Sequence, residues 1–266
     1  MISQPAFISK RIRRYIINLA QLLSIALISL SVSGQAPQRK SPLAAELLEQ
    51  FKNEKVFWRQ IDIAEKIVAL HDSSILPELV SWLNHDDRHL RGNVAFIFSG
   101  LGDERGFEVI SAILKDQSYR PQGQGQARVS SDGRYHVEQQ IRADRYYAVH
   151  LFGLLKNARA VPVLVPLLVD RELNYKVAWA LGEIGDRSAI RPLIETLQDR
   201  SPDVRVDAIQ ALEKLGAREA LPDLRALLND QETTHFHART GQGPQVSVGE
   251  IARETITKLE AGSKAH

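Results

Sequence analysis

Apolar residues recur at three- and four-residue intervals from residue 43 to residue 260, a spacing typical of amphipathic helices. Within this stretch, the segments 177–185 and 186–197 recur 31 residues later as 208–216 and 217–228. A fixed period of this length indicates a solenoid, because a single helical hairpin cannot bury its apolar face and must stack on its neighbours. We therefore predict an all-α fold, a right-handed α-α superhelix of stacked hairpins with two loop insertions.

The same register places the other repeats along the chain. It predicts five hairpins, over residues 56–87, 88–116, 144–170, 172–200 and 201–230. A helix over 43–51 comes before them, where Ser41 caps the helix and Pro42 takes its first position, and a last helix over 248–259 follows them. Together these elements make a repeat domain over 43–266.

Residues at fixed positions of each repeat have structural roles. Each first helix has a small or β-branched residue where it meets the next repeat, and a large apolar residue four positions later. These pairs are Val94 and Phe98, Ala148 and Phe152, Val177 and Leu181, Ala208 and Leu212, and Ala252 and Ile256. Gly102, Gly185 and Gly216 stand at helix ends, where glycine adopts the left-handed conformation without strain. Asp103 and Asp186 come next, placed to cap the following helix.

The segments 178–193 and 202–224 resemble HEAT repeats of the type first named for phycobilisome lyases. The first reads Ala-Trp-Ala-Leu-Gly-Glu-Ile-Gly-Asp and then Ala-Ile-Arg-Pro-Leu, and the resemblance covers about residues 56–260 apart from two insertions. It implies the superhelix named above, but such repeats serve scaffolds, adaptors and a few enzymes alike. Among the enzymes, bilin lyases act on cytoplasmic or plastid antenna proteins. Deoxyhypusine hydroxylases bind iron through His-Glu pairs, and this chain has no His-Glu dipeptide.

The resemblance also assigns an arginine early in the first helix of the repeat. It is present as Arg91, Arg145 and Arg205. Two repeats lack this arginine and have Asn174 or Gly249 in its place. The third repeat has Lys156-Asn157 instead of the Gly-Asp turn, which leaves the geometry of that turn open.

Two connections between hairpins are longer than the others. Tight repeats leave about nine residues between the aspartate that ends one hairpin and the small residue of the next first helix, whereas 117–143 and 231–247 add about 23 and 13 residues. Both contain Gly-Gln-Gly, and insertions in solenoids often lie on the binding face. We therefore expect the binding residues in or beside these insertions. The candidates are Tyr119, Arg120, Arg128, Arg134, Tyr135, His136, Tyr146, His235, Phe236 and His237.

Local structure in the insertions has alternatives. Residues 128–137 fit a β-hairpin with an Asp-Gly turn, or else a polar loop. Of the adjacent Tyr146 and Tyr147, we expect one to pack in the core and the other to face outward. His235 and His237 would lie on one side of an extended segment, but no third ligand is near in sequence, so we expect no metal site.

Residues 1–34 have the three parts of a secretion signal: a basic start at 10–14, an apolar stretch at 15–30 and small residues at 31–34. We expect cleavage of this segment and a periplasmic or secreted protein. The alternative is an uncleaved membrane anchor, because the apolar stretch approaches the length that spans a bilayer. A polar linker, 35–42, follows the segment.

Composition narrows the function further. Four of the 34 lysines and arginines lie in the signal segment, so the rest of the chain has 30 against 32 acidic residues, and this balance near −2 argues against a nucleic-acid partner. There is no cysteine, which excludes disulfides and thiolate chemistry. We predict an exported scaffold or adaptor, not an enzyme and without a cofactor, that binds a protein partner through its concave face and the two insertions. The alternative is a lyase-type or other enzyme accessory subunit that binds a small ligand in the groove.

Overall fold

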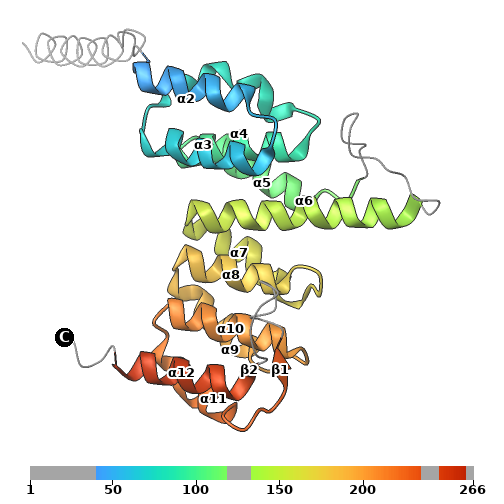
Figure 1. The fold of residues 1–266 in the computed structure, drawn as a ribbon, viewed down its shortest axis with the longest axis vertical. Helices are drawn as coiled ribbons and strands as arrows, with labels where there is room; N and C mark the ends of the chain where they lie inside the picture. Colours follow the sequence, from blue (N-terminus) through green and yellow to red (C-terminus); the bar gives the residue numbers. More distant parts are fainter. Residues whose placement is uncertain (1–39, 119–132, 235–245, 262–266) are drawn as a thin grey trace, which may run out of the picture. The chain divides into compact units, whose positions relative to one another are not determined.

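The computed structural model describes the backbone of residues 40–118, 133–234 and 246–261, and their side chains except those of 133–137. The described helices belong to one compact unit, Pro42–His266, in which helical hairpins lie one upon another (Figure 1). This arrangement confirms the predicted all-α solenoid.

The hairpins follow the predicted register. Their first helices are α3 (Phe57–Ala69), α4 (Arg88–Gly100), α6 (Gly133–Leu155), α8 (Asn174–Ile184) and α10 (Pro202–Lys214). Their second segments are η1 (Ser73–Glu78) with η2 (Val80–Asn84), α5 (Glu104–Lys115), α7 (Val161–Leu164) with η4 (Val165–Val169), α9 (Ile190–Thr196) and α11 (Leu221–Ala226). The 3-10 turns η3 (Ala158–Ala160), η5 (Arg187–Ala189) and η6 (Arg218–Ala220) lead into the last three. α2 (Pro42–Asn53) comes before the hairpins and α12 (Val248–Ala261) after them.

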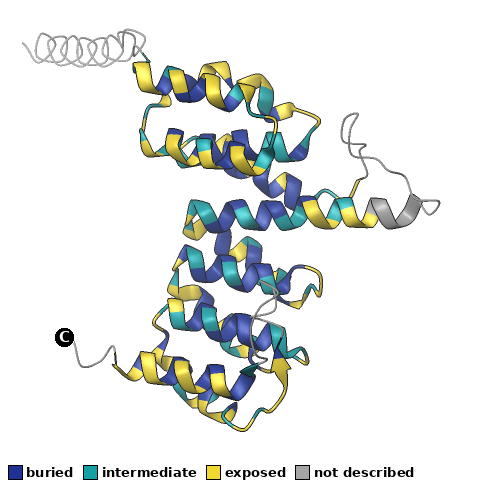
Figure 2. Ribbon diagram, in the orientation of Figure 1, coloured by how far each residue is buried: buried dark blue, intermediate teal, exposed yellow. Residues whose placement is uncertain are grey.

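The core lies between the stacked first helices and between each first helix and the second segment of its hairpin, and Figure 2 shows buried positions along these helices. The predicted small residues, such as Ala148, Val177 and Ala208, are fully buried, and so are the large residues four positions later, except Ile256 at 9% exposure. At the joint of α8 and α10, a Cβ added to Gly182 would lie 3.1 Å from the Cα of Ala211. Small residues therefore set the close approach of neighbouring repeats.

The turn between the two parts of a hairpin has the predicted geometry. Gly102, Gly185 and Gly216 have φ angles of 85°, 77° and 60°, the left-handed region that glycine enters without strain. Asp103 and Asp186 each accept a hydrogen bond from the backbone N–H two residues later, which caps the second segment.

Two hairpins keep this turn without glycine. His71 and Lys156 occupy the glycine position with φ angles of 53° and 51°, a conformation that costs a side-chain-bearing residue about 1–2 kcal/mol. Asp72 and Asn157 still supply the cap, each accepting from the N–H two residues later. The third repeat, whose geometry the sequence left open, therefore forms the same turn as the others.

The first insertion is helical from residue 133 onward. α6 starts at Gly133, so the predicted hairpin over 128–137 is wrong from residue 133 onward, and the polar-loop alternative fails there too. Residues 138–143 are mostly good helix formers, and each residue added to an existing helix gains a backbone hydrogen bond without a new nucleation step. The rest of this insertion, 119–132, lies outside the described residues.

The second insertion is closed at its base by a short antiparallel ladder between β1 (Thr233–Thr234) and β2 (Val246–Ser247). Ser247 then starts α12 with a capping box, because its N–H donates to Glu250 Oε2 at 2.9 Å and its Oγ accepts from the N–H of Glu250 at 3.3 Å. Residues 235–245 lie outside the described residues.

The N-terminal segment 1–34 also lies outside the described residues, so cleavage, anchoring and export stay predictions. Within the described ranges, no helix is both long enough and apolar enough to cross a bilayer.

Candidate functional site

A row of aromatic and imidazole rings runs across the first helices of four consecutive hairpins, α3, α4, α6 and α8. Its members, called the aromatic row below, are Phe57, His89, Tyr147, His150 and Trp179. Successive ring centroids lie 4.2, 5.0, 6.2 and 5.1 Å apart, within the range of favourable ring contacts. Tyr147 is buried and the other four rings are partly exposed, so the row lines a strip of the surface.

Helix geometry and one glycine bring these rings together. Tyr147 and His150 are three residues apart on α6 and therefore share a face of the helix. Trp179 on α8 packs directly on Gly153 of α6, where an added Cβ would lie 2.5 Å from Cζ3 of the indole. Any side chain at this glycine would displace the indole ring.

A buried cation lies at the Trp179 end of the row. Lys176 is 8% exposed, and its ammonium lies 3.3 Å from the Trp179 ring centroid and 5.1 Å from that of Tyr146. Tyr146 in turn lies 5.9 Å from Tyr175. The negative faces of the aromatic rings stabilise the ammonium in this position. The result is a positive charge beside a partly exposed indole.

The histidines of the row favour their neutral forms. Burial, and then the charge of Lys176, lower the pKa of His150 to about 4. Its Nδ1 is buried and has no hydrogen-bond partner among the described residues. Burial also lowers the pKa of His89, although Asp144 opposes that shift. At neutral pH the row therefore offers uncharged imidazoles, which can each donate one hydrogen bond and accept another.

A buried hydrogen-bond ladder fixes the middle of the row. The hydroxyl of Tyr147 donates to Oδ1 of Asn93, whose Nδ2 donates to Oε1 of Gln60 and to the carbonyl of Phe57, both at 2.9 Å. Burial raises the pKa of Tyr147, which keeps this hydroxyl protonated. α3, α4 and α6 are therefore held in register by polar contacts as well as by packing.

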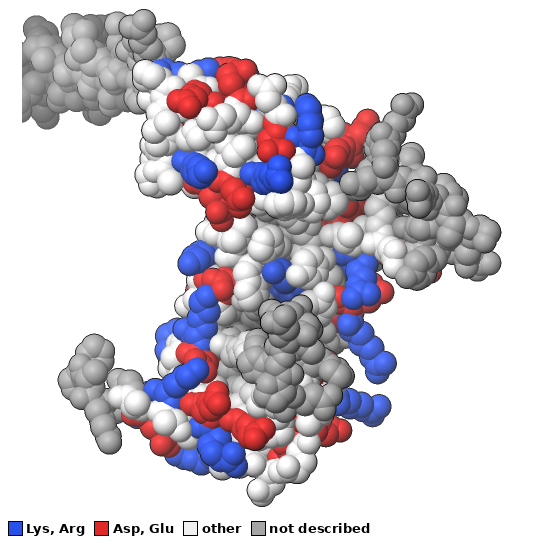
Figure 3. All heavy atoms as spheres, in the orientation of Figure 1, with Lys and Arg blue, Asp and Glu red and all other residues white. Residues whose placement is uncertain are grey.

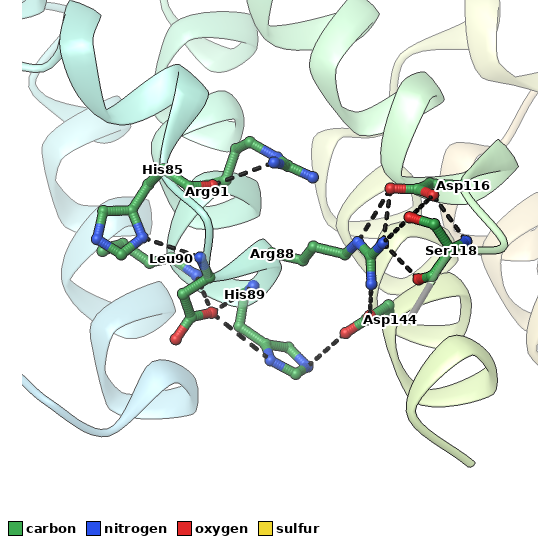
Figure 4. Close-up of polar contacts among 9 residues, drawn as sticks. His85, Arg88, His89, Leu90, Arg91, Asp116, Ser118 and Asp144 are labelled. Carbon is green, nitrogen blue, oxygen red and sulfur yellow. Dashed lines mark hydrogen bonds and ion pairs between the residues drawn. The ribbon is translucent and has the colours of Figure 1, made fainter. Parts of the chain in front are cut away.

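Arg88 joins α4 to the ends of the first insertion (Figure 4). It is 1% exposed, and its Nη1 donates to Oδ2 of Asp144 at 2.7 Å, a carboxylate whose side chain has no exposed area. Its Nη2 donates to Oδ2 of Asp116 and to the carbonyl of Ser118, both at 2.7 Å. Figure 4 also shows the His89 imidazole directed toward Asp144, 3.9 Å away. The network therefore anchors both ends of the insertion and contacts the aromatic row.

The arginines that the HEAT-like resemblance assigns do not all bind the aspartate at the end of their hairpin. Arg145 and Arg205 each bind the aspartate that ends their own hairpin, at 2.7 Å. In the second hairpin, Arg91 instead donates to the carbonyl of His85, and Arg88, one turn earlier, binds the terminal Asp116. Sequence reasoning missed Arg88, although Asp116 stands at the same register position as Asp170 and Asp230, the aspartates that Arg145 and Arg205 bind.

Most of the predicted binding residues lie outside the described side chains. Tyr119, Arg120, Arg128, His235, Phe236 and His237 lie outside the described residues, and Arg134, Tyr135 and His136 fall in α6 with their side chains undescribed. Tyr146 is described and partly exposed, while Tyr147 is 7% exposed and packs in the core. The described chain brings together Tyr146 and the aromatic row, most of which the sequence did not single out.

Charges on the face drawn in Figure 3 are mixed. Over its described part, lysines and arginines alternate with aspartates and glutamates. This pattern differs from the continuous basic stripe that a nucleic-acid phosphate backbone requires. Among the described residues there is also no group of three or more His, Asp or Glu side chains placed to hold a metal ion.

Parts of the chain are similar to HEAT repeats and to proteins whose names refer to bilins. Residues 161–236 match the family of HEAT repeats. The chain is 41% identical over 95 residues to "Phycocyanobilin lyase subunit alpha" of Picosynechococcus sp., covering 32% of this chain and 35% of that protein. It is 36% identical over 100 residues to "Bilin biosynthesis protein PecE" of Mastigocladus laminosus (36% and 37% covered), and 28% identical over 152 residues to PecE of Nostoc sp. (56% and 54%). The chain thus matches about a third to a half of the length of these relatives.

Proposed function

We propose that this chain, a HEAT-repeat protein related to bilin lyase subunits, is a lyase-type accessory protein that binds an open-chain tetrapyrrole along the aromatic row. The observation that carries the proposal is the row itself, a strip of rings that crosses four hairpins beside a buried cation. The relatives' names support the ligand class, because they refer to a bilin. The function thus moves from the predicted adaptor toward the alternative that the sequence left open.

The chemistry of the row fits a long, flat, conjugated ligand that carries carboxylates. Such a ligand stacks on successive rings, and Trp179 and His150 already lie in stacked geometry, 27° apart in plane. The Lys176 ammonium attracts a carboxylate at this end of the row. His150, kept neutral by burial and by Lys176, can hydrogen-bond to a pyrrole nitrogen without presenting a second charge.

Titration of the full chain with phycocyanobilin tests this proposal. We expect a change in the visible absorbance band and saturable quenching of tryptophan fluorescence. Removing the indole with Trp179→Leu should weaken binding about ten- to a hundredfold, the loss of about 1.5–3 kcal/mol of ring contact. Trp58→Leu is the matched control, because Trp58 is 54% exposed and lies outside the row. Absent binding, or equal weakening by the two variants, would sink the proposal.

A protein partner remains the second part of the proposal. One relative is named as a lyase subunit, and a subunit implies an assembly with another chain. In that role the insertions 117–143 and 231–247 are still the predicted contact segments. Deleting residues 119–132 and measuring assembly by size-exclusion chromatography with a co-expressed lyase subunit tests this part, and unchanged assembly would refute the contact.

We also propose that the protein is exported. It is supported by the basic, apolar and small-residue succession within residues 1–34. Cell fractionation with sequencing of the mature N-terminus is the test. A cytoplasmic protein that keeps residues 1–34 would contradict export.

A further inference from the structure

One register position of the repeat faces solvent in every hairpin, directly after a leucine of the second segment. Its five occupants are Asn84, Lys115, Val169, Gln198 and Asn229, and all five are exposed. Four of them are polar, as expected for a position that contacts water. Val169 is apolar and 85% exposed, the highest value among the exposed large hydrophobic residues that the structure describes.

The segment that carries Val169 differs from its counterparts in charge. Residues 161–169 contain no charged side chain. The second segments of the other four hairpins each contain at least one, for example Glu78, Glu104, Arg191 and Asp223. A single exposed valine is ordinary on a protein surface, but a whole uncharged outward segment is not required by the stacking of the repeats.

Next to Val169 lies a groove of about 340 Å³ between η4 and α9, called the valine groove below. Val165, Leu168, Val169 and Pro192 form its apolar part. Its only charged lining residues, within the described chain, are the acids Glu195 and Asp199.

The negative rim is available to an incoming cation. Asp199 uses Oδ1 to accept from the N–H of Ser201 at 2.8 Å, and this bond does not engage its second carboxylate oxygen. Glu195 lies 3.5 Å from Arg191, but these side chains are 70% and 91% exposed. An ion pair this exposed contributes little, so a partner's cation can replace it at small cost.

We propose that the valine groove docks a protein partner through one apolar side chain that is flanked, in the partner, by Lys or Arg. The apolar floor selects the first residue and the two carboxylates select the second. The inference rests on the protein-partner part of the proposed function and names the chemistry of that partner. The groove lies on second segments and the aromatic row on first helices, so bilin binding and docking can fail independently.

A random 12-residue peptide display library, selected on the immobilised full chain, tests the groove without a known partner. The selected peptides should share an apolar residue next to Lys or Arg. A fluorescent copy of the strongest peptide is then titrated by anisotropy. Val169→Lys should weaken it at least about tenfold, and this variant is expected to fold because Lys115 occupies the same register position in the second hairpin. Glu195→Gln should weaken it about threefold and reduce its dependence on salt.

Leu43→Lys is the control, because Leu43 is 51% exposed on α2, away from the groove. Less than twofold weakening in this variant, with the tenfold loss in Val169→Lys, supports the proposal. It is overturned if no peptide is enriched, if the enriched peptides are acidic or lack an apolar residue, or if both lysine variants weaken binding equally. Self-association that is abolished by Val169→Lys would also overturn it, because the occupant would then be a second copy of this chain.

Discussion

Replacing Arg88 with methionine should be among the most destabilising single changes in the described chain. Methionine keeps the unbranched length but leaves Asp144, whose side chain has no exposed area, without the guanidinium that donates to it at 2.7 Å. Removing one partner of a buried ion pair costs about 3–5 kcal/mol, because the other charge stays buried without compensation. Asp116, whose pKa lies well below its usual range through Ser118 and Arg88, would lose part of its support as well.

The assay is urea unfolding followed by circular dichroism at pH 7, with Arg187→Met as the matched control. Arg187 pairs with Glu219 at 2.6 Å, but the two side chains are 64% and 46% exposed, so this change should cost under about 1 kcal/mol. Adding Asp144→Asn to Arg88→Met should restore about half of the loss, because the uncompensated charge is gone. Equal destabilisation by the two methionine variants, or no recovery in the double variant, would refute the account of Arg88.

Two further predictions concern the third repeat. The pKa of His150 is about 4 in the folded chain against 6.5 for an ordinary histidine, so between these values only the unfolded chain is protonated, and stability should fall by about 3 kcal/mol from pH 7 to pH 4. Urea midpoints measured from pH 7 to pH 4 should show a smaller loss of stability in His150→Gln than in the unaltered chain, and an unchanged loss in the exposed control His85→Gln. If His150→Gln loses as much stability over this range as the unaltered chain, the prediction is wrong. Lys156→Gly should stabilise the chain by about 1 kcal/mol, because Lys156 holds a φ of 51°, while Gly216→Lys should destabilise it similarly; thermal unfolding measures both, and a destabilised Lys156→Gly would show that the lysine side chain contributes more than its backbone costs.

The two proposals use different parts of the repeat. The aromatic row depends on rings that already contact one another across α3, α4, α6 and α8, and ligand binding there adds stacking to an ordered surface. The valine groove depends on one residue that breaks the polar pattern of its register. The proposed function uses both surfaces, one for a chromophore and one for an assembly partner.

The periodic part of the protein was predictable from sequence because its physics is local. The spacing of Val177 and Leu181, repeated at Ala208 and Leu212, determines which helix face is buried, and all four residues are fully buried. A glycine directly after such a helix favours a left-handed turn, as Gly185 does here. These rules act within a dozen residues, so a single amino-acid sequence is sufficient to apply them.

The β-hairpin predicted in the first insertion was wrong from residue 133 onward because it, too, was inferred from a local pattern. An Asp-Gly turn and alternating residues favour a hairpin locally, but the segment from Gly133 continues into the existing α6, and extending a helix needs no new nucleation.

The candidate site was decided by tertiary structure. Phe57, His89 and Trp179 are far apart in sequence. They form a row with Tyr147 and His150 only because consecutive first helices stack in register. Sequence alone determined the repeat, its turns and its buried faces. Which exposed side chains meet across repeats, and which cation reaches Asp116 and Asp144, depended on the distance between stacked helices, a quantity that no local pattern encodes.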